Sequence, residues 1–297
     1  MDFTLTADQA ALATSLDKLA ARYETKPTAF HGFALTSPAL EQELEDGGFF
    51  EIARIPELGP LAAAMAVERL ARLPYAAEVA LSMLVRPQLE GDWPRPFALV
   101  ENGRPGRFVA QARTVLAIEG ETVTMLQPLS DTVEPVDSLF AYPMGRLAST
   151  QGGTVLPDGP AVRKWLRVAL AAEAAGLMQA AIATTVEHVS LRQQFGRPLG
   201  SLQALRHRLA ECTMLAGGLR LLALKAAWTE ADGDAALAAL HAQESATRIV
   251  YDLHQMLGAM GMTLEHPLHL WTYRLKALIA ELGGRGGQAG AVAQYGF

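Results

Sequence analysis

The stretch that decides the fold is Arg192-Gln193-Gln194-Phe195-Gly196-Arg197-Pro198-Leu199-Gly200-Ser201-Leu202-Gln203. Its glycines and proline disfavour helix, so it should separate two helical segments. On its N-terminal side a helix is expected over residues 160–191. On its C-terminal side Ser201 is placed to act as an N-cap. Apolar residues then recur every three or four positions, as helix packing requires: Leu202, Leu205, Leu209, Cys212, Leu215, Leu219, Leu222 and Ala226.

The rest of the C-terminal part also has helical character. Asp232-Gly233-Asp234 is expected to form a turn and cap before a helix over residues 235–260, and a last helix should cover residues 267–282. Four long helices with short links predict an antiparallel bundle. Residues 283–290 contain too many glycines for a regular element. Two uses remain open for them: a phosphate cradle of backbone N–H groups or a frayed terminus.

The first half of the chain changes character near residue 86. Thr6 and Gln9 fit a capping box that opens a helix, and further helices are expected at residues 38–46, 61–73 and 75–84. Proline and glycine then punctuate short apolar runs at residues 97–101, 107–111, 114–118, 122–126 and 138–142. These runs predict a small β domain with a hairpin at Glu119-Gly120-Glu121. We therefore expect a mainly α protein with N-terminal helices at 1–88, a β domain at 89–157 and a four-helix bundle at 158–297.

Composition narrows the function classes. The 297 residues are half apolar, enough for a substantial core. The net charge of −6 without clustered Lys or Arg argues against nucleic-acid binding. Cys212 is the single cysteine, which excludes an internal disulfide and suits a reducing compartment. The N-terminus lacks the features of a signal peptide. Residues 165–186 are interrupted by Arg167, Glu173 and Gln179, so a buried helix is expected rather than a membrane span. A cytoplasmic protein is predicted.

A second motif, Gln255-Met256-Leu257-Gly258-Ala259-Met260-Gly261, closes the third bundle helix. With the Arg192–Gln203 stretch and the order of helices, β domain and bundle, it resembles the acyl-CoA dehydrogenases, most closely over residues 166–282. The resemblance implies FAD as cofactor. It also implies α,β-desaturation of an acyl-CoA thioester: a base takes the alpha proton, FAD takes the beta hydride, and an electron-transfer flavoprotein accepts the electrons.

The resemblance assigns roles within the first motif. Arg192 matches the family arginine that meets the FAD pyrophosphate of a neighbouring subunit, a task that suits its bidentate fork. Phe195 would pack beside it, Gly196 allows the tight turn, and Gln203 follows at the family's spacing. Gln194 and Leu199 belong to the same cofactor-binding segment. In a purely structural alternative, Arg192 only interacts favourably with the helix dipole at the C-terminus of the preceding helix.

The second motif matches the family's Gln-x-x-Gly-Gly-x-Gly, whose glutamine and backbone touch the ADP half of FAD. Gln255, Gly258 and Gly261 fit, and Ala259 departs from the second glycine. The structural alternative is a helix that ends in glycines. His266 and His269 lie near by without a third ligand, so no metal site is expected.

The family's catalytic carboxylate is hard to place. A base must lie within hydrogen-bond reach of the alpha proton. One family position falls on Leu166 and the other on Leu282. Glu281 is one residue off, which on a helix turns a side chain by about 100°. It is the candidate base, and its alternative is an exposed carboxylate at a helix end. Glu173, among alanines, is expected to be a paired structural carboxylate.

The β domain also lacks the family's flavin-ring loops, and residues 97–106 occupy that region without a match. This pattern resembles one subunit of the heterotetrameric dehydrogenases of bacterial steroid side-chain degradation. Such a chain would be inactive alone and would complete the FAD site of a second dehydrogenase subunit, with a steroid side-chain CoA ester as the implied substrate. Two alternatives stay open: a self-sufficient homo-oligomer with Glu281 as base, and a flavin-free structural partner.

Overall fold

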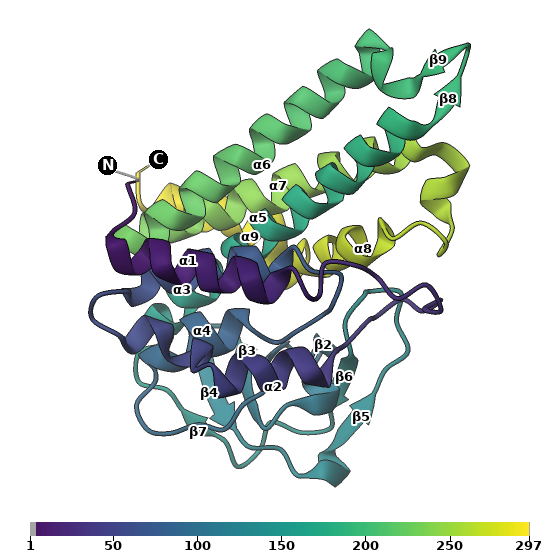
Figure 1. The fold of residues 1–297 in the computed structure, drawn as a ribbon. Helices are drawn as coiled ribbons and strands as arrows, with labels where there is room; N and C mark the ends of the chain where they lie inside the picture. Colours follow the sequence, from purple (N-terminus) through teal and green to yellow (C-terminus); the bar gives the residue numbers. More distant parts are fainter. Residues whose placement is uncertain (1–3, 297) are drawn as a thin grey trace.

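The computed structural model describes residues 4–296 (Figure 1). Its N-terminal part is helical: α1 (Ala7–Ala20), α2 (Pro38–Asp46), the 3-10 turn η1 (Phe49–Arg54), α3 (Gly59–Ala71), α4 (Ala80–Leu84) and η2 (Arg86–Gln88). The capping box is confirmed, because Thr6 Oγ1 accepts from the Gln9 amide at 3.2 Å and Gln9 Oε1 accepts from the Thr6 amide at 3.1 Å. Ser37 caps α2 in the same manner.

The helix predicted over residues 75–84 is wrong in its first half, since α4 begins only at Ala80. The residues before it make tertiary contacts instead. The Ala76 amide bonds to the Leu35 carbonyl at 2.6 Å. The buried Glu78 carboxylate accepts from the amides of Ser82 and Phe97 and thereby links α4 to the first strand.

The β region consists of short strands in two sheets below the helices (Figure 1). They are β1 (Phe97–Glu101), β2 (Gly106–Arg107), β3 (Thr114–Glu119), β4 (Thr122–Leu126), β5 (Val133–Pro135), β6 (Met144–Leu147) and β7 (Thr154–Val155), with 3-10 turns η3 (Val109–Gln111) and η4 (Ser130–Thr132). One sheet has the order β1-β3-β4-β7 and the other β2-β6-β5. β1 pairs with β3 in parallel, and the predicted β3–β4 hairpin around Gly120 is confirmed.

Two predicted strands are wrong. Residues 138–142 form bends, because the Phe140 amide donates to Ser138 Oγ in a local turn and Tyr142 reaches inward with its hydroxyl. The strand predicted over residues 107–111 ends at Arg107. The next residue, Phe108, has a left-handed backbone with φ 63°, which a strand does not accommodate, and a 3-10 turn follows.

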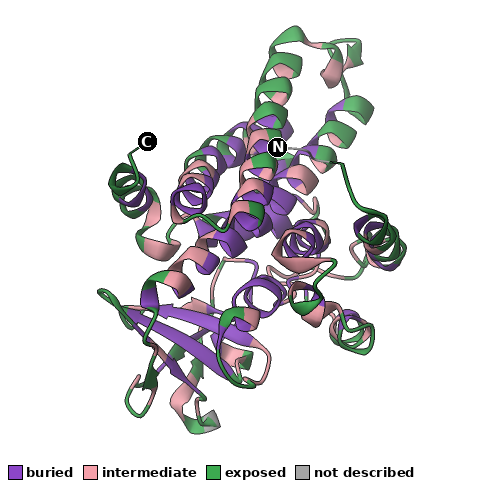
Figure 2. Ribbon diagram, turned by 90° about the vertical axis from the view of Figure 1, so that its left-hand side faces the viewer, coloured by how far each residue is buried: buried purple, intermediate pink, exposed green. Residues whose placement is uncertain are grey.

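The C-terminal part is the predicted bundle: α5 (Gly159–Leu191), α6 (Gln203–Thr229), α7 (Asp232–Leu257) and α8 (His269–Leu278), followed by α9 (Gly284–Gln294). The links contain β8 (Gln193–Gln194), β9 (Arg197–Pro198) and the 3-10 turns η5 (Leu199–Ser201), η6 (Gly258–Met262) and η7 (Glu281–Gly283). Buried residues line the inner sides of the helices and sheet (Figure 2). The prediction of a mainly α fold with a small β part is confirmed.

α5 is the central helix. By length and composition it could span a membrane, but 78% of its most apolar window is buried inside the protein. It passes so close to α3 that a Cβ on Gly176 would lie 2.1 Å from the Glu68 carbonyl oxygen. Glycine is therefore required there.

Four predictions about the bundle are wrong. Residues 232–234 form the first turn of α7 instead of a turn and cap before it. α6 begins after Leu202, and Ser201 Oγ donates to the Pro198 carbonyl instead of capping. The last predicted helix stops at Leu278. The glycine-rich segment then forms α9, because tertiary contacts override its poor helix propensity. Gln288 accepts from Arg167 and donates to the Leu282 carbonyl, while Ala291 and Val292 pack on α7.

α8 is attached to the N-terminal helices by two side chains. Arg274 is fully buried and donates to the backbone carbonyls of Leu73, Tyr75 and Leu270 at 2.6–2.9 Å. Trp271 Nε1 donates to the Arg72 carbonyl at 2.9 Å. Both contacts join segments about 200 residues apart in sequence, so α8 ties the two ends of the chain together.

Candidate functional site

The α5–α6 connection is a tight hairpin at the far end of the bundle (Figure 1). β8 and β9 pair through Gln193 with Pro198 and Gln194 with Arg197, which leaves Phe195 and Gly196 as a two-residue loop. Both loop residues have positive φ, at 55° and 76°, as the favoured hairpin turns require. Glycine accepts this backbone freely. Phe195 does not, and its side chain is 82% exposed.

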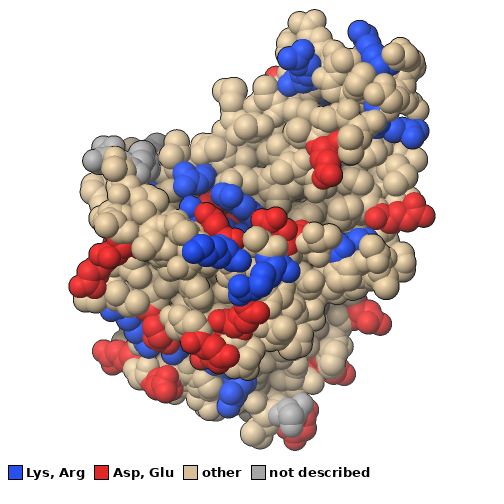
Figure 3. Space-filling model, viewed as in Figure 1, with Lys and Arg blue, Asp and Glu red and all other residues tan. Residues whose placement is uncertain are grey.

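Arg192 ends α5 and is exposed at the base of this hairpin. Its carbonyl accepts from the Leu199 amide at 2.9 Å, which fixes its backbone. Among the described residues, the ion pairs at this end of the bundle involve Arg208 and Arg248 and leave Arg192 out. No acidic residue occurs between residues 188 and 210, and basic side chains gather at this end of the molecular surface (Figure 3).

Gln203 opens α6 and is exposed on the same connection, with its amide 3.4 Å from His207 Nε2. The predicted residues Arg192, Gln194, Phe195, Gly196, Leu199 and Gln203 therefore all lie in one continuous segment. This segment offers positive charge, an aromatic ring and an amide to a molecule outside the chain.

Gln255 and Gly258 line a cleft of about 550 Å³ at the end of α7. Tyr251, Tyr273 and Lys276 form other parts of its wall, and sequence reasoning did not single them out. The tyrosines supply ring faces and the lysine supplies a positive charge, so the cleft suits an aromatic or anionic group.

Gly258 and Gly261 of this motif are required for different structural reasons. Gly258 has φ 58° and ψ −135°, a backbone that only glycine adopts easily. Gly261 is buried, and a Cβ there would lie 3.0 Å from Leu257 Cβ and 3.1 Å from the His254 carbonyl. Ala259 is exposed inside η6 without a positive φ. The departure from the family's second glycine therefore causes no strain.

His266 and His269 are occupied within the protein. His266 Nδ1 accepts from the Leu268 amide, and both ring nitrogens of His269 face carbonyl oxygens, those of His266 and Gly32. Burial, with the neighbouring His188 and other cations, lowers the pKa of His266 to about 4. Within residues 4–296 no group of three or more His, Cys, Asp or Glu side chains is arranged to hold a metal ion.

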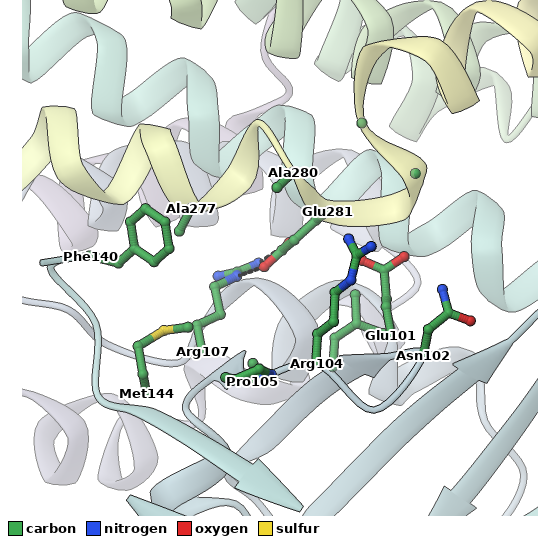
Figure 4. A pocket seen from close by; sticks show the side chains of 14 residues that line it. Glu101, Asn102, Arg104, Pro105, Arg107, Phe140, Met144, Ala277, Ala280 and Glu281 are labelled. Carbon is green, nitrogen blue, oxygen red and sulfur yellow. Dashed lines mark hydrogen bonds and ion pairs between the residues drawn. The ribbon is translucent and has the colours of Figure 1, made fainter. Parts of the chain in front are cut away.

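Glu281 lies elsewhere, at the junction of the β region and the bundle (Figure 4). It lines a pocket of about 520 Å³ between the β1–β2 loop and the start of α9. Arg107 donates to both of its oxygens, at 2.6 and 3.3 Å, and also to the buried Glu173 at 2.7 Å. Glu173 in turn accepts from the Tyr142 hydroxyl at 2.7 Å. The alternative of an exposed carboxylate at Glu281 is therefore wrong, and the expected pairing of Glu173 is confirmed.

The electrostatics of this junction follow from burial. Burial raises the pKa of Glu281, while the Arg107 guanidinium opposes that shift. Burial also works to lower the pKa of Arg107, but Glu173 and Glu281 outweigh it and hold that pKa above its ordinary value. The pKa of Glu101, on the other wall, is raised by burial. The Glu101 carboxylate accepts from the Leu282 amide at 2.7 Å. Arg107 thus remains a cation between two carboxylates.

The structure places the predicted residues in two groups. The α5–α6 hairpin lies at the same end of the bundle as the C-terminal end of α7 (Figure 1), where Gln255 and Gly258 line the cleft. Glu281 is apart from them in the junction pocket, and Leu166 is buried in α5. Sequence reasoning missed Arg107. The one signal for it was Glu173, since a carboxylate in an apolar helix calls for a cation.

Known proteins match this chain in part of its sequence and in its fold. Residues 164–292 match the model of the acyl-CoA dehydrogenase C-terminal domain. "Acyl-CoA dehydrogenase FadE34" from Mycobacterium tuberculosis is 36% identical over 164 residues. That alignment covers 52% of this chain and 23% of the relative, so the chain spans about a quarter of that protein.

Solved structures match over the whole chain. A chain of the ChsE4–ChsE5 complex from Mycobacterium tuberculosis superposes with a TM-score of 0.74 and 20% identity, covering 99% of this chain and 98% of that one. A chain of the Tcur3481–Tcur3483 steroid ACAD gives the same TM-score and identity, with 98% of each chain covered. At such identities the likeness concerns the fold. Residues 164–292 are thus similar to an acyl-CoA dehydrogenase C-terminal domain, and the chain as a whole has the acyl-CoA dehydrogenase fold.

Proposed function

We propose that this chain is a subunit of a heteromeric, FAD-dependent acyl-CoA dehydrogenase. It is inactive alone, and it completes the FAD site of a second dehydrogenase subunit with Arg192, Phe195, Gln203 and the Gln255–Gly261 segment. The observation that carries the proposal is the hairpin at the bundle end. Its arginine is exposed, and its phenylalanine holds a side chain that is 82% exposed on a left-handed backbone.

The residues at the bundle end fit the phosphate half of FAD. An arginine with no acidic partner can bind phosphate oxygens with two parallel N–H groups. The left-handed backbone of Phe195 costs conformational energy, a feature that gathers at ligand sites. The cleft beside Gln255 adds two tyrosine rings and Lys276, which suit a nucleotide.

The junction pocket does not fit a working active site of this chain's own. A base needs a free carboxylate oxygen, and both oxygens of Glu281 accept from Arg107. Arg107 cannot withdraw without depriving the buried Glu173 of its ion-pair partner. Glu281 thus serves in binding the β region to the bundle.

FAD, when bound, supplies the hydride acceptor of the reaction. In this proposal the present chain's part is binding: Arg192 neutralises phosphate charge, Phe195 shields it from water, and Gln203 and Gln255 orient the cofactor's polar groups. Proton removal belongs to the partner. An acyl-CoA with a steroid side chain as substrate and an electron-transfer flavoprotein as acceptor complete the proposal, supported by the steroid ACAD among the structural neighbours.

The test uses the complex purified from its source through a tag on this chain. Arg192→Ala should lower FAD retention by ten- to hundredfold in the dissociation constant, about the value of one charged hydrogen-bonded contact. Arg146→Ala, an exposed arginine on β6, is the matched control and should retain FAD fully. Unchanged FAD content in the Arg192 variant, measured by flavin absorbance, would contradict the proposal.

Glu281 as base remains the alternative, because it does line a pocket. That alternative requires the chain alone to be yellow and to lose turnover, with FAD retained, in Glu281→Gln. Our proposal expects a colourless chain alone, and a complex whose turnover survives the same substitution.

A further inference from the structure

A further pocket lies beside Arg192, between the end of α5 and the loop before α8. Its volume is about 470 Å³. Thr184, His188 and Arg192 line it from α5, and His266 and Pro267 line it from the loop. Thr184 and His188 are four residues apart, so their side chains share one face of the helix. Arg192 follows at the same spacing, where α5 ends. The pocket therefore gathers a hydroxyl, two imidazole rings and a guanidinium.

The hydroxyl of Thr184 is not used by the helix that carries it. A threonine inside a helix can donate to the carbonyl four residues earlier. The other threonines in the interiors of the described helices all do so: Thr14, Thr185, Thr213, Thr247 and Thr272. Within residues 4–296, Thr184 Oγ1 has no hydrogen-bond partner. Its hydroxyl is therefore available to a molecule in the pocket.

His266 supplies a fixed donor. The Leu268 amide donates to its Nδ1 at 3.2 Å, so the proton of the neutral ring is on Nε2. That Nε2–H has no partner in the described part of the chain. Lys26 holds the loop in place, because its Nζ donates to the carbonyls of Leu264 and Glu265 at 3.3 and 3.4 Å. Since the pKa of His266 is about 4, the ring stays a neutral donor.

His188 is the group that can change its charge. Its ring packs edge-on against the ring of His266, with the centroids 5.3 Å apart. No hydrogen bond to a described residue holds either of its nitrogens. Burial and the charge of Arg192 lower its pKa from the ordinary 6.5, so the ring is neutral at neutral pH when no ligand is bound. An anion beside it would reverse that shift.

The side chains around the two rings that shift their pKa are all basic: Arg192, Lys26, His254 and His269. Glu187 also lines the pocket, but it shifts the pKa of neither ring. The C-terminus of α5 carries partial negative charge, which favours a protonated histidine and disfavours an uncompensated anion. An anion in this pocket therefore needs Arg192 and a protonated His188 together.

We propose that this pocket seats the diphosphate of the FAD held by the second subunit, with Thr184 and His188 as binding residues beside Arg192. The inference rests on the proposed function and extends it to residues outside both sequence motifs. Each phosphate of the cofactor carries a negative charge. Arg192 neutralises one, and His188 neutralises the other by taking up a proton from solvent as FAD binds. Thr184 and the Nε2–H of His266 donate to phosphate oxygens.

FAD affinity should therefore depend on pH. The bound diphosphate raises the pKa of His188 above its value in the flavin-free complex, so binding takes up a proton. Affinity is greatest below the lower of these two pKa values. It falls by up to about tenfold per pH unit between them and is weakest above the higher one.

The first experiment uses the heteromeric complex, purified through a tag on this chain. FAD affinity is measured by equilibrium dialysis and flavin absorbance from about pH 6 to about pH 8.5, the range in which a histidine titrates. The wild type should lose affinity about tenfold over this range. His188→Gln should bind FAD more weakly at the acidic end and should show no such dependence. His31→Gln, an exposed histidine of the N-terminal part, should behave as the wild type. A pH dependence that His188→Gln leaves unchanged overturns the proposal.

Calorimetry measures the proton uptake directly. FAD is titrated into the flavin-free complex at about pH 7, in Tris and in PIPES, two buffers whose ionisation enthalpies differ. The binding enthalpies of the wild type should differ between the buffers, and those of His188→Gln should agree. Equal enthalpies for the wild type, or a difference that survives in His188→Gln, would contradict proton uptake at this residue.

Thr184→Val removes the hydroxyl and keeps the shape of the side chain. The dissociation constant of FAD should rise about three- to tenfold at every pH, as expected for one neutral hydrogen bond, and the pH dependence should remain. Thr213→Val, an exposed threonine on α6 whose hydroxyl donates to the Leu209 carbonyl, should change neither. Full affinity in Thr184→Val would be evidence against this seat for the diphosphate. Circular dichroism melts verify that the variants fold.

The outcomes separate this inference from the proposed function. If Arg192→Ala loses FAD while His188→Gln and Thr184→Val bind it as the wild type does, the pocket assignment is wrong and the function stands. If Arg192→Ala keeps its FAD, both are wrong. A phosphate of CoA in this pocket would instead raise the KM for the acyl-CoA in His188→Gln with FAD affinity unchanged, and that result would also overturn the proposal.

Discussion

The Arg107 guanidinium donates to both carboxylate oxygens of Glu281, at 2.6 and 3.3 Å, from a β-strand to the turn after α8. The two residues are 174 positions apart. A third group, Glu173 on α5, shares the same arginine at 2.7 Å. One buried cation therefore neutralises two carboxylates and joins three segments of the chain.

Removal of that cation should be costly. Arg107→Ala leaves two carboxylates without their buried partner, and breaking such pairs typically destabilises by about 3–5 kcal/mol. We expect a loss of that size in the free energy of unfolding, measured by urea denaturation at neutral pH. Arg104→Ala, an exposed arginine in the same pocket, should change it by less than about 0.5 kcal/mol. Equal effects of the two substitutions would show that the ion cluster does not hold the junction.

The histidine at the bundle end should make stability depend on pH. Burial lowers the pKa of His266 to about 4, below the ordinary value of 6.5. The unfolded chain therefore takes up the proton more readily, and protonation favours unfolding as the pH falls from 6.5 towards 4. The stability that the neutral His266 contributes is fully present above pH 6.5 and is lost as the pH falls towards 4. Urea midpoints of the wild type and His266→Gln should converge as the pH falls through this window. The exposed His207→Gln is the control, and a wild-type-like pH profile for His266→Gln would refute the assignment.

The crossing of α3 and α5 predicts opposite effects for two glycines. Gly176→Ala places a Cβ 2.1 Å from a backbone oxygen, so the helices must separate. Overpacking of this kind costs about 1–3 kcal/mol. Gly286→Ala, in α9, meets no atom within 4 Å and should stabilise by about 0.5–1 kcal/mol, because alanine is the better helix former. Thermal unfolding of the two variants measures both changes in stability. A stabilising Gly176→Ala would show that α3 and α5 do not cross so closely.

Substitution of the strained loop residue Phe195 should weaken cofactor binding without lowering stability. Phe195→Gly removes an exposed side chain from a left-handed backbone, so the chain should lose no stability in thermal unfolding. In the heteromeric complex the same variant should retain less FAD, because the ring no longer covers the phosphates. Phe195→Tyr keeps the ring and should retain FAD normally. Full retention by the glycine variant would exclude a role for the ring.

Much of the helical fold could be predicted from local sequence. The end of α5 at Leu191 was predicted because the residues that follow contain glycine and proline, and the capping box of α1 was visible in Thr6 and Gln9. The β region was harder. Its strands are two to six residues long, and the parallel β1–β3 pairing depends on contacts that no local pattern records. α9 was missed because its stability comes from packing on α7 rather than from its own glycine-rich sequence.

The candidate site also has a part that local sequence predicts and a part that it does not. The hairpin residues were predictable as a group because Arg192 and Gln203 are only eleven positions apart, and the turn chemistry of Phe195-Gly196 is local. The geometry of Glu281 was not predictable. It depends on the break of the helix after Leu278 and on the left-handed backbone of Leu282, with φ 54°. Its partner Arg107 comes from a distant strand, and pairing over such distances leaves no trace in periodicity.

The buried guanidinium of Arg274 has a consequence for local opening. It holds the carbonyl of the buried Leu73 and that of the half-buried Tyr75. If α8 moved away, these carbonyls and a permanent cation would lose their partners together. Hydrogen exchange should therefore show the amides of α8 and of the segment after α3 opening as one cooperative unit, although the sequence separates them by about 200 residues.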